Sequence, residues 1–168
     1  MQPRVAIVMG STSDLPVMDK AAAVLDQLEV PFELIALSAH RTPAQVAAFA
    51  AEAEGRGLQV VIAAAGMAAA LPGVIAAHTV LPVIGVPVKG MLDGLDALLS
   101  IVQMPPGIPV ATVGVNAAQN AAILACQVMA TADTALAGRL RVYKDGLAQK
   151  VVKANEDLAA VQYKYKTN

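Results

Sequence analysis

Short apolar runs alternate with amphipathic stretches over most of the chain. The first of these runs contains no polar residue, which is typical of a strand buried on both faces of a parallel sheet. The first run, VAIVM, stops at Gly10. The five runs that we interpret as strands lie at 5–9, 32–37, 60–64, 83–88 and 110–115.

Helical periodicity fills the intervals between these runs. The first interval opens with Asp14 and Pro16, which are start signals for a helix. The apolar residues that follow recur at helical spacing: Val17, Ala21, Val24, Leu25 and Leu28. Later intervals predict helices at 71–77, 93–102 and 117–130.

The second interval carries the most complete set of helix signals. Thr42 is the expected cap, Pro43 occupies the first turn, and Gln45 stands three residues after the cap, as in a capping box. This helix should end near Gly55 or Gly57, because glycine commonly follows the last helical residue.

Strands that alternate with helices imply a parallel sheet covered on both faces and joined by right-handed crossovers. We therefore predict an α/β chain with a flavodoxin-like three-layer fold and a five-stranded parallel sheet. A length of 168 residues suits one compact domain that spans 1–168.

The last part of the chain, 131–168, has a different composition. Helical periodicity around Leu136, Leu140, Tyr143 and Leu147 predicts a long C-terminal helix. Its apolar side has no predicted partner within the chain, so we expect this helical extension to pack on a neighbouring subunit of a homo-oligomer.

Composition narrows the classes of partner. The net charge of −1 and the pI near 6.1 provide no field that would attract nucleic acid or an anionic membrane surface. Two long stretches, 57–88 and 97–132, contain no charged residue, but prolines and polar amides interrupt them, so a membrane span is not expected.

Cysteine and histidine are scarce. The single cysteine, Cys126, excludes an intrachain disulfide, and two histidines far apart provide no metal-binding spacing. The first residues lack the basic region and long apolar run of a signal peptide. We expect a cytoplasmic protein without a metal.

Three loops follow predicted strands and therefore lie at the carboxyl edge of the sheet, where open α/β folds bind ligands. The first, GSTSD at 10–14, combines Gly10 with hydroxyls and amides at a helix N-terminus, which suits an anion. Asp14 would repel a phosphate, so a sugar hydroxyl is its expected ligand. Alternatively, Ser13 and Asp14 only cap the helix. The loop matches neither GK[ST] nor GxGxxG.

The second loop, SAHRTP at 38–43, places a histidine beside an arginine. The Arg41 guanidinium can bind a phosphate through two hydrogen bonds, and His40 can exchange a proton near neutral pH. The alternative is that His40 is a structural hydrogen-bond donor. We expect a structural role for His78, which lies away from the strand ends.

The third loop, AGMAAALPG at 65–73, offers backbone amides and a small apolar surface. Such a surface can enclose a small ligand and exclude water. Taken alone, the segment would also fit a tight turn between a strand and a helix.

Together, the three loops resemble the PurE family of purine biosynthesis. MGSTSD, SAHRTP and AGMAAALPG are similar to the family's MGSxSD, SAHRTP and AGxAAxLPG, and the resemblance extends in order over about 4–130, through LPVIGVPV, GLDALLSIVQMPPGIPVATV and NAAQNAAILA. This resemblance implies an isomerase, an N5-carboxyaminoimidazole ribonucleotide mutase, that moves a carboxylate from nitrogen to carbon C4 without metal, cofactor or ATP. It also implies octamers with sites at subunit contacts.

The resemblance assigns roles to residues of all three loops. His40 corresponds to the general acid and base. The residues that it implies for substrate binding are Ser11, Ser13, Asp14, Ser38, Arg41, Gly66, Ala68 and Leu71.

One position departs from the mutase pattern. Mutases usually have histidine directly before LPG, where this chain has Ala70. A related class that carboxylates aminoimidazole ribonucleotide directly with CO2 has alanine there, but it has SAHKT and LSG where this chain has Arg41 and Pro72. We therefore favour the interpretation of this chain as a mutase, with the direct carboxylase as the alternative. A non-catalytic ribonucleotide-binding module on the same fold is a further possibility.

Overall fold

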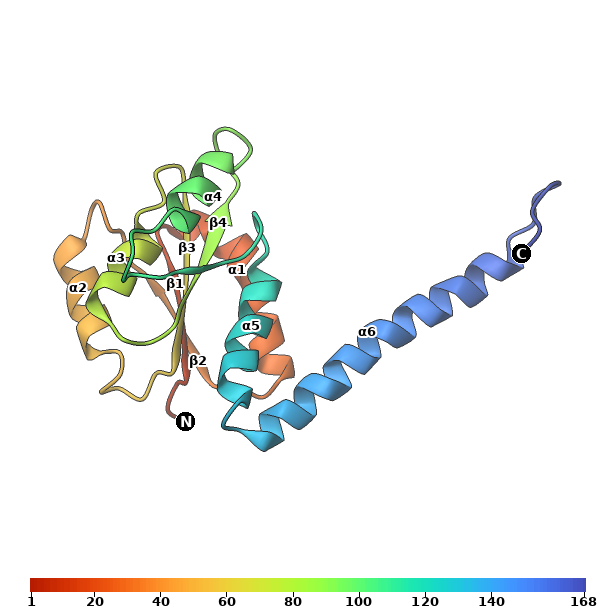
Figure 1. The fold of residues 1–168 in the computed structure, drawn as a ribbon, viewed down its shortest axis with the longest axis horizontal. Coiled ribbons are helices and arrows are strands. Elements are labelled where there is room, and N and C mark those ends of the chain that lie inside the picture. Colours follow the sequence, from red (N-terminus) through yellow and green to blue (C-terminus); the bar gives the residue numbers. More distant parts are fainter.

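The computed structural model describes residues 1–168 and consists of a parallel sheet with helices on both faces (Figure 1). The strand order is β2-β1-β3-β4-β5. The strands are β1 (Val5–Met9), β2 (Phe32–Ala36), β3 (Val60–Gly66), β4 (Val83–Val88) and β5 (Ala111–Thr112). The predicted flavodoxin-like α/β fold is therefore confirmed.

Six α-helices and one short 3-10 helix connect and extend the strands. They are η1 (Thr12–Asp14), α1 (Leu15–Gln27), α2 (Pro43–Glu52), α3 (Leu71–His78), α4 (Leu95–Val102), α5 (Ala118–Ala130) and α6 (Thr134–Ala160). The helices after the first four strands lie within a few residues of the predicted bounds.

The two faces of the sheet bury two separate cores. In β1, Val5 and Ile7 pack in one cluster with α1, α5 and the start of α6, while Ala6 and Val8 pack in the other with α2, α3 and α4. All four side chains are fully buried, because neighbouring residues of a strand point to opposite faces and both faces are covered.

The fifth strand is shorter than predicted. The expected run at 110–115 forms regular pairing with β4 only at Ala111 and Thr112. Val113 still donates its backbone N–H to the Gly85 carbonyl oxygen (3.2 Å), but the chain then turns, and Ala117 N–H bonds to the Gly114 carbonyl oxygen. The apolar run could not show where the pairing ends, because the hydrogen bonds of a strand depend on its neighbouring strand.

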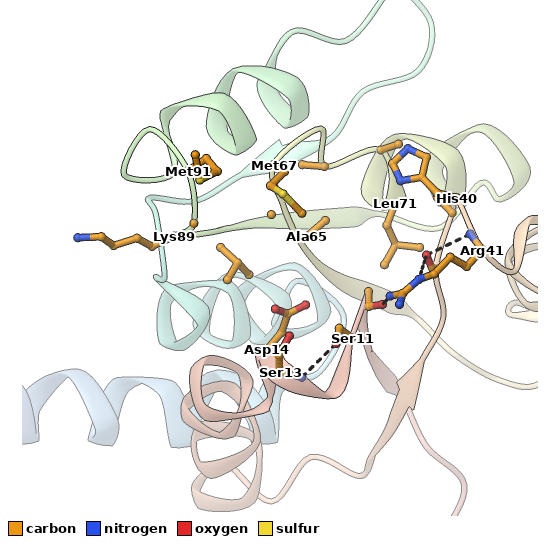
Figure 2. A pocket seen from close by; sticks show the side chains of 18 residues that line it. Ser11, Ser13, Asp14, His40, Arg41, Ala65, Met67, Leu71, Lys89 and Met91 are labelled. Atoms are coloured by element: carbon orange, nitrogen blue, oxygen red, sulfur yellow. Dashed lines mark hydrogen bonds between the residues drawn. The ribbon is translucent and has the colours of Figure 1, made fainter.

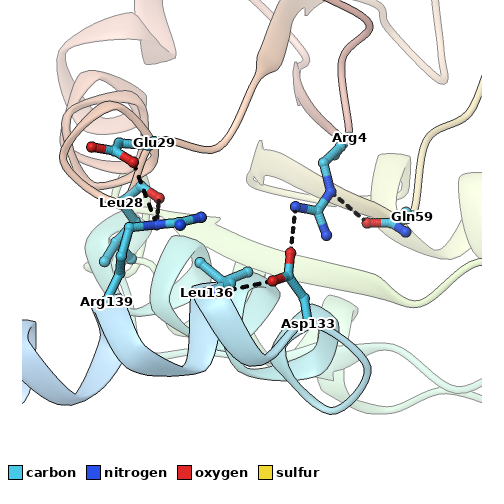
Figure 3. A network of polar contacts seen from close by, with 7 residues as sticks. All are labelled: Arg4, Leu28, Glu29, Gln59, Asp133, Leu136 and Arg139. Carbon is cyan, nitrogen blue, oxygen red and sulfur yellow. Dashed lines mark hydrogen bonds and ion pairs between the residues drawn. The ribbon is translucent and has the colours of Figure 1, made fainter.

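The start of α6 is fastened to the body of the protein (Figure 3). Asp133 accepts hydrogen bonds from the Leu136 backbone N–H and from Arg4 Nη1, both at 2.9 Å, and Arg4 Nε donates to Gln59 Oε1 at 2.8 Å. The bond from Leu136, followed by the contact with Arg4, lowers the pKa of the Asp133 carboxyl. Arg139 Nε adds a 2.7 Å bond to the Leu28 carbonyl oxygen.

The rest of α6 projects away from the body (Figure 1). Leu136 and Leu140 are its only buried residues. The predicted long C-terminal helix is present, and most of its length has no partner within the chain. The exposed apolar side chains of this region are Val142, Leu147, Val151, Val152, Leu158, Val161, Tyr163 and Tyr165. None of the helices has both the length and the apolar character needed to cross a bilayer.

Candidate active site

A cavity of about 640 Å³ opens at the carboxyl ends of the strands. Its lining comes from the segments after β1, β2, β3 and β4, at 10–14, 38–41, 65–71 and 88–91. Parallel pairing brings these strand ends to one edge, so loops distant in sequence face one another. The volume is within the range of small-molecule sites.

The first loop forms a short helical turn at the end of β1. Ser11 caps η1, and its Oγ accepts a hydrogen bond from the Ser13 backbone N–H at 3.2 Å. Asp14 precedes α1 without a side-chain capping bond, so its carboxyl is available to the cavity. Burial raises the pKa of this carboxyl, and contacts with the Ser11 backbone and the Ser13 side chain oppose that rise.

The second loop is closed by hydrogen bonds between Ser38 and Thr42. Thr42 Oγ1 accepts from the Ser38 backbone N–H (2.9 Å) and donates to the Ser38 carbonyl oxygen (3.1 Å). Thr42 is the N-cap residue of α2, as predicted, but its hydroxyl faces this turn and makes no cap bond to the helix. That helix also ends at Glu52, earlier than expected, and a turn leads on to Gly57, whose φ is +86°.

Arg41 joins the first two loops. Its Nη2 donates to the Gly10 carbonyl oxygen at 2.8 Å, and its Nε donates to Ser38 Oγ at 3.2 Å. A guanidinium has five N–H donors in total, so these two bonds leave Nη1 and part of Nη2 for a ligand. The guanidinium is thus held in a fixed orientation at the edge of the cavity.

His40 is an exposed neighbour of Arg41 and also lines the cavity. Figure 2 shows the two side chains at one end of the cavity, with Lys89 at the opposite end and Asp14 between them. His40 and Arg41 therefore share one end of the cavity, whereas the Lys89 side chain points away from the other labelled side chains and pairs with Asp93.

The third loop is a tight turn that also forms cavity wall. Met67 and Ala69 have positive φ values of 53° and 29°, and the Ala69 N–H donates to the Gly66 carbonyl oxygen at 3.0 Å. A Cβ at Gly66 would lie 3.3 Å from the Val88 carbonyl oxygen, which explains why a glycine lies where β3 passes β4. Both interpretations of this loop, turn and apolar wall, are therefore compatible with its geometry.

The site residues named from the sequence fall into two groups. Those that line the cavity are Ser11, Ser13, Asp14, Ser38, His40, Arg41, Gly66 and Leu71, and Ala70 lines it as well. Ala68 is exposed and does not line the cavity. His78 borders a separate hollow beside Glu54. No three His, Cys, Asp or Glu side chains are grouped as metal ligands would be.

Sequence reasoning missed the fourth wall of the cavity. Val88, Lys89, Gly90 and Met91 line it, and Lys89 is a cation placed directly after β4. The rule that identified the first three loops, position at the carboxyl end of a parallel strand, would have identified this one. Unlike the loop with His40 and Arg41, this segment has no histidine beside its cation.

Comparisons with known proteins agree with this geometry. A sequence model described as AIR carboxylase matches residues 4–150. A Pyrococcus abyssi protein named N5-carboxyaminoimidazole ribonucleotide mutase is 55% identical over 146 residues, which cover 86% of this chain and 84% of that protein. The Schizosaccharomyces pombe phosphoribosylaminoimidazole carboxylase is 52% identical over 163 residues; these are 96% of this chain but only 30% of that longer protein.

Solved structures show the same fold. The crystal structure of Treponema denticola PurE superimposes with a TM-score of 0.84 at 30% sequence identity, and the alignment covers 93% of this chain and 98% of that one.

Proposed function

This chain belongs to the AIR carboxylase family, and from that membership we propose that it is an N5-carboxyaminoimidazole ribonucleotide mutase, an isomerase of purine biosynthesis. The resemblance to PurE expected from the three loops is confirmed. One observation carries the proposal: His40, Arg41, Ser11 and Asp14 come from two loops and meet at a single cavity of about 640 Å³.

Arg41 and the first loop account for binding of a ribonucleotide. The unused N–H donors of Arg41 and the Ser11 hydroxyl receive the phosphate, while Asp14 accepts hydrogen bonds from ribose hydroxyls. The Asp14 charge disfavours a phosphate at its own position, so it helps to set the direction in which the substrate lies. Ser13 and Ser38 complete this end of the site.

His40 accounts for the proton transfers. The carbamate nitrogen–carbon bond breaks, CO2 leaves, and protonated His40 delivers a proton to that nitrogen. C4 of the imidazole then attacks CO2, a carbon–carbon bond forms, and neutral His40 removes the C4 proton. The two transfers cancel, so His40 returns to its starting state.

The third loop keeps the intermediate in place. Gly66, Ala70 and Leu71 present a small apolar surface beside the reacting ring. CO2 is apolar and would be lost to solvent from an open polar site, so a dry wall favours its recapture. Binding energy from the distant phosphate orients the imidazole against this wall.

A turnover assay tests the proposal directly. N5-carboxyaminoimidazole ribonucleotide is supplied at low bicarbonate, in parallel with aminoimidazole ribonucleotide and added bicarbonate. Rapid conversion of the first substrate is the expected result. If neither substrate is converted but the protein still binds the ribonucleotide, the chain is a non-catalytic binding module.

The direct carboxylase is the second candidate, and Ala70 is the observation in its favour. This residue lies in the cavity wall, so it faces the same ligand as His40. Conversion that requires added bicarbonate would assign the carboxylase reaction. The Arg41 side chain and the 55% identity to the Pyrococcus abyssi mutase favour the mutase.

We also propose that the chain assembles as a homo-octamer through α6. The apolar side chains exposed at 142–165 are unfavourable in water unless another surface buries them. A second copy of the chain presents the same apolar surface and can bury them. Light scattering after size-exclusion chromatography should give a mass near eight chains of 17.2 kDa. A chain that stops at Asp145 should form a smaller species, and a wild-type mass of one chain would contradict the assembly.

A further inference from the structure

The wall formed by 88–91 is tied to the end of β5 by one side chain. Asn116 Oδ1 accepts a hydrogen bond from the Lys89 backbone N–H at 2.9 Å. The Asn116 backbone N–H donates to the Pro87 carbonyl oxygen at 2.8 Å. Asn116 therefore holds the chain on both sides of Val88, where β4 ends and the cavity wall begins.

The backbone of Asn116 explains which residue types can do this. Its φ is 57°, a left-handed conformation that glycine, asparagine and aspartate tolerate better than other residues. Glycine would keep the conformation but has no side-chain acceptor. Only asparagine and aspartate combine the conformation with a short oxygen acceptor.

The neighbouring residue fixes the far end of the same segment. A Cβ at Gly94, whose φ is +88°, would lie 2.7 Å from Val115 Cγ1. Residues 115 and 116 thus touch both ends of the stretch from Lys89 to Gly94. Within this stretch, Lys89 Nζ and Asp93 Oδ1 form an ion pair that is exposed to solvent. Exposed ion pairs contribute little to stability.

The stretch is strained and exposed between these two ends. Leu92 and Asp93 have positive φ values of 48° and 53°, although neither is glycine. Met91 and Leu92 are 69% and 73% exposed, so burial does little to hold them. Such a segment keeps its position only where the surrounding structure fixes it.

We propose that Asn116 is a positioning residue, whose side-chain amide oxygen holds the 88–91 wall against the substrate; the inference rests on the mutase activity proposed above. The wall contributes backbone and apolar surface, and its one titratable side chain, Lys89, pairs with Asp93. Loss of the bond from Asn116 therefore weakens substrate binding in the ground and transition states alike, and it leaves the His40 proton transfers intact.

Two variants separate the side-chain bond from the backbone conformation. Asn116→Gly keeps the left-handed backbone and removes the acceptor, while Asn116→Asp keeps both. Steady-state kinetics should show KM raised about tenfold in Asn116→Gly with kcat within about twofold, because tenfold corresponds to about 1.4 kcal/mol, which is within the range for one hydrogen bond. Asn116→Asp should stay within about threefold of wild type in both constants.

Hydrogen exchange provides a readout that does not depend on turnover. The Lys89 amide should exchange about tenfold faster in Asn116→Gly than in wild type and should remain protected in Asn116→Asp. Unchanged exchange in Asn116→Gly overturns the inference whatever reaction the protein catalyses. An unchanged KM in Asn116→Gly, or equal impairment of both variants, overturns the positioning role even if exchange changes. A wild-type protein without mutase turnover refutes the proposed function, and the exchange result then decides separately whether Asn116 holds the wall.

Discussion

Arg41 donates from Nη2 to the Gly10 carbonyl oxygen at 2.8 Å and so connects the loop after β2 to the end of β1. In sequence, η1, α1 and β2 separate the two residues. This bond fixes the guanidinium relative to the hydroxyls of the first loop. It also places His40, the preceding residue in the chain, beside the same cavity.

Replacement of His40 by asparagine should remove turnover and preserve binding. Asparagine has similar size but exchanges no proton near neutral pH, so kcat should fall by about a hundred-fold to ten-thousand-fold with little change in ligand affinity. Steady-state kinetics and calorimetric binding of the ribonucleotide measure the two effects. His78→Asn is the matched control and should keep wild-type activity. Near-normal kcat in His40→Asn would show that another group transfers the proton.

Arg41→Lys should mainly weaken substrate binding. Lysine keeps the charge but loses the planar fork and the bonds to Gly10 and Ser38, so KM should rise about tenfold or more, with a smaller change in kcat. Arg141→Lys, on the exposed part of α6, is the matched control for replacing an arginine by a lysine and should leave KM unchanged. An unchanged KM in Arg41→Lys would refute phosphate binding by this residue.

Asp14→Asn should stabilise the protein at neutral pH while weakening substrate binding. The folded state raises the pKa of Asp14, chiefly through burial, so the charged carboxylate opposes folding above that pKa. Below the ordinary carboxyl pKa, Asp14 is protonated in both states and this cost disappears. The Tm gain of the variant should therefore be present at pH 7 and shrink toward pH 3. A gain of the same size at both pH values would mean that charge burial is not its cause.

The Cys126 thiol should be unreactive in the folded protein. Burial raises its pKa to about 11, against small opposing effects of Arg4 and Arg139, so almost none is thiolate at pH 8. A thiol-specific disulfide reagent should release no colour from native protein over minutes and should titrate one thiol per chain in denaturant. Rapid reaction of the native protein would show that the core around α5 opens readily.

The hydrophobic pattern by itself determined the alternation of strands and helices, and from it the parallel sheet. Because parallel strands bring their carboxyl ends together, the sequence alone places the loops with Ser11, His40 and Gly66 at one edge. Strand periodicity and helix signals are local properties of the chain, which is why they can be read along it.

Only the tertiary structure decided which atoms meet at that edge. The bond from Arg41 to Gly10, the wall at Lys89, the acceptor role of Asn116 and the short β5 all depend on contacts between segments far apart in sequence. The Thr42 hydroxyl had two possible partners, the helix that follows it or the turn that precedes it, and the closed turn prevailed. Hydrogen bonds of this kind depend on distances of a few tenths of an ångström, which the order of residues does not contain.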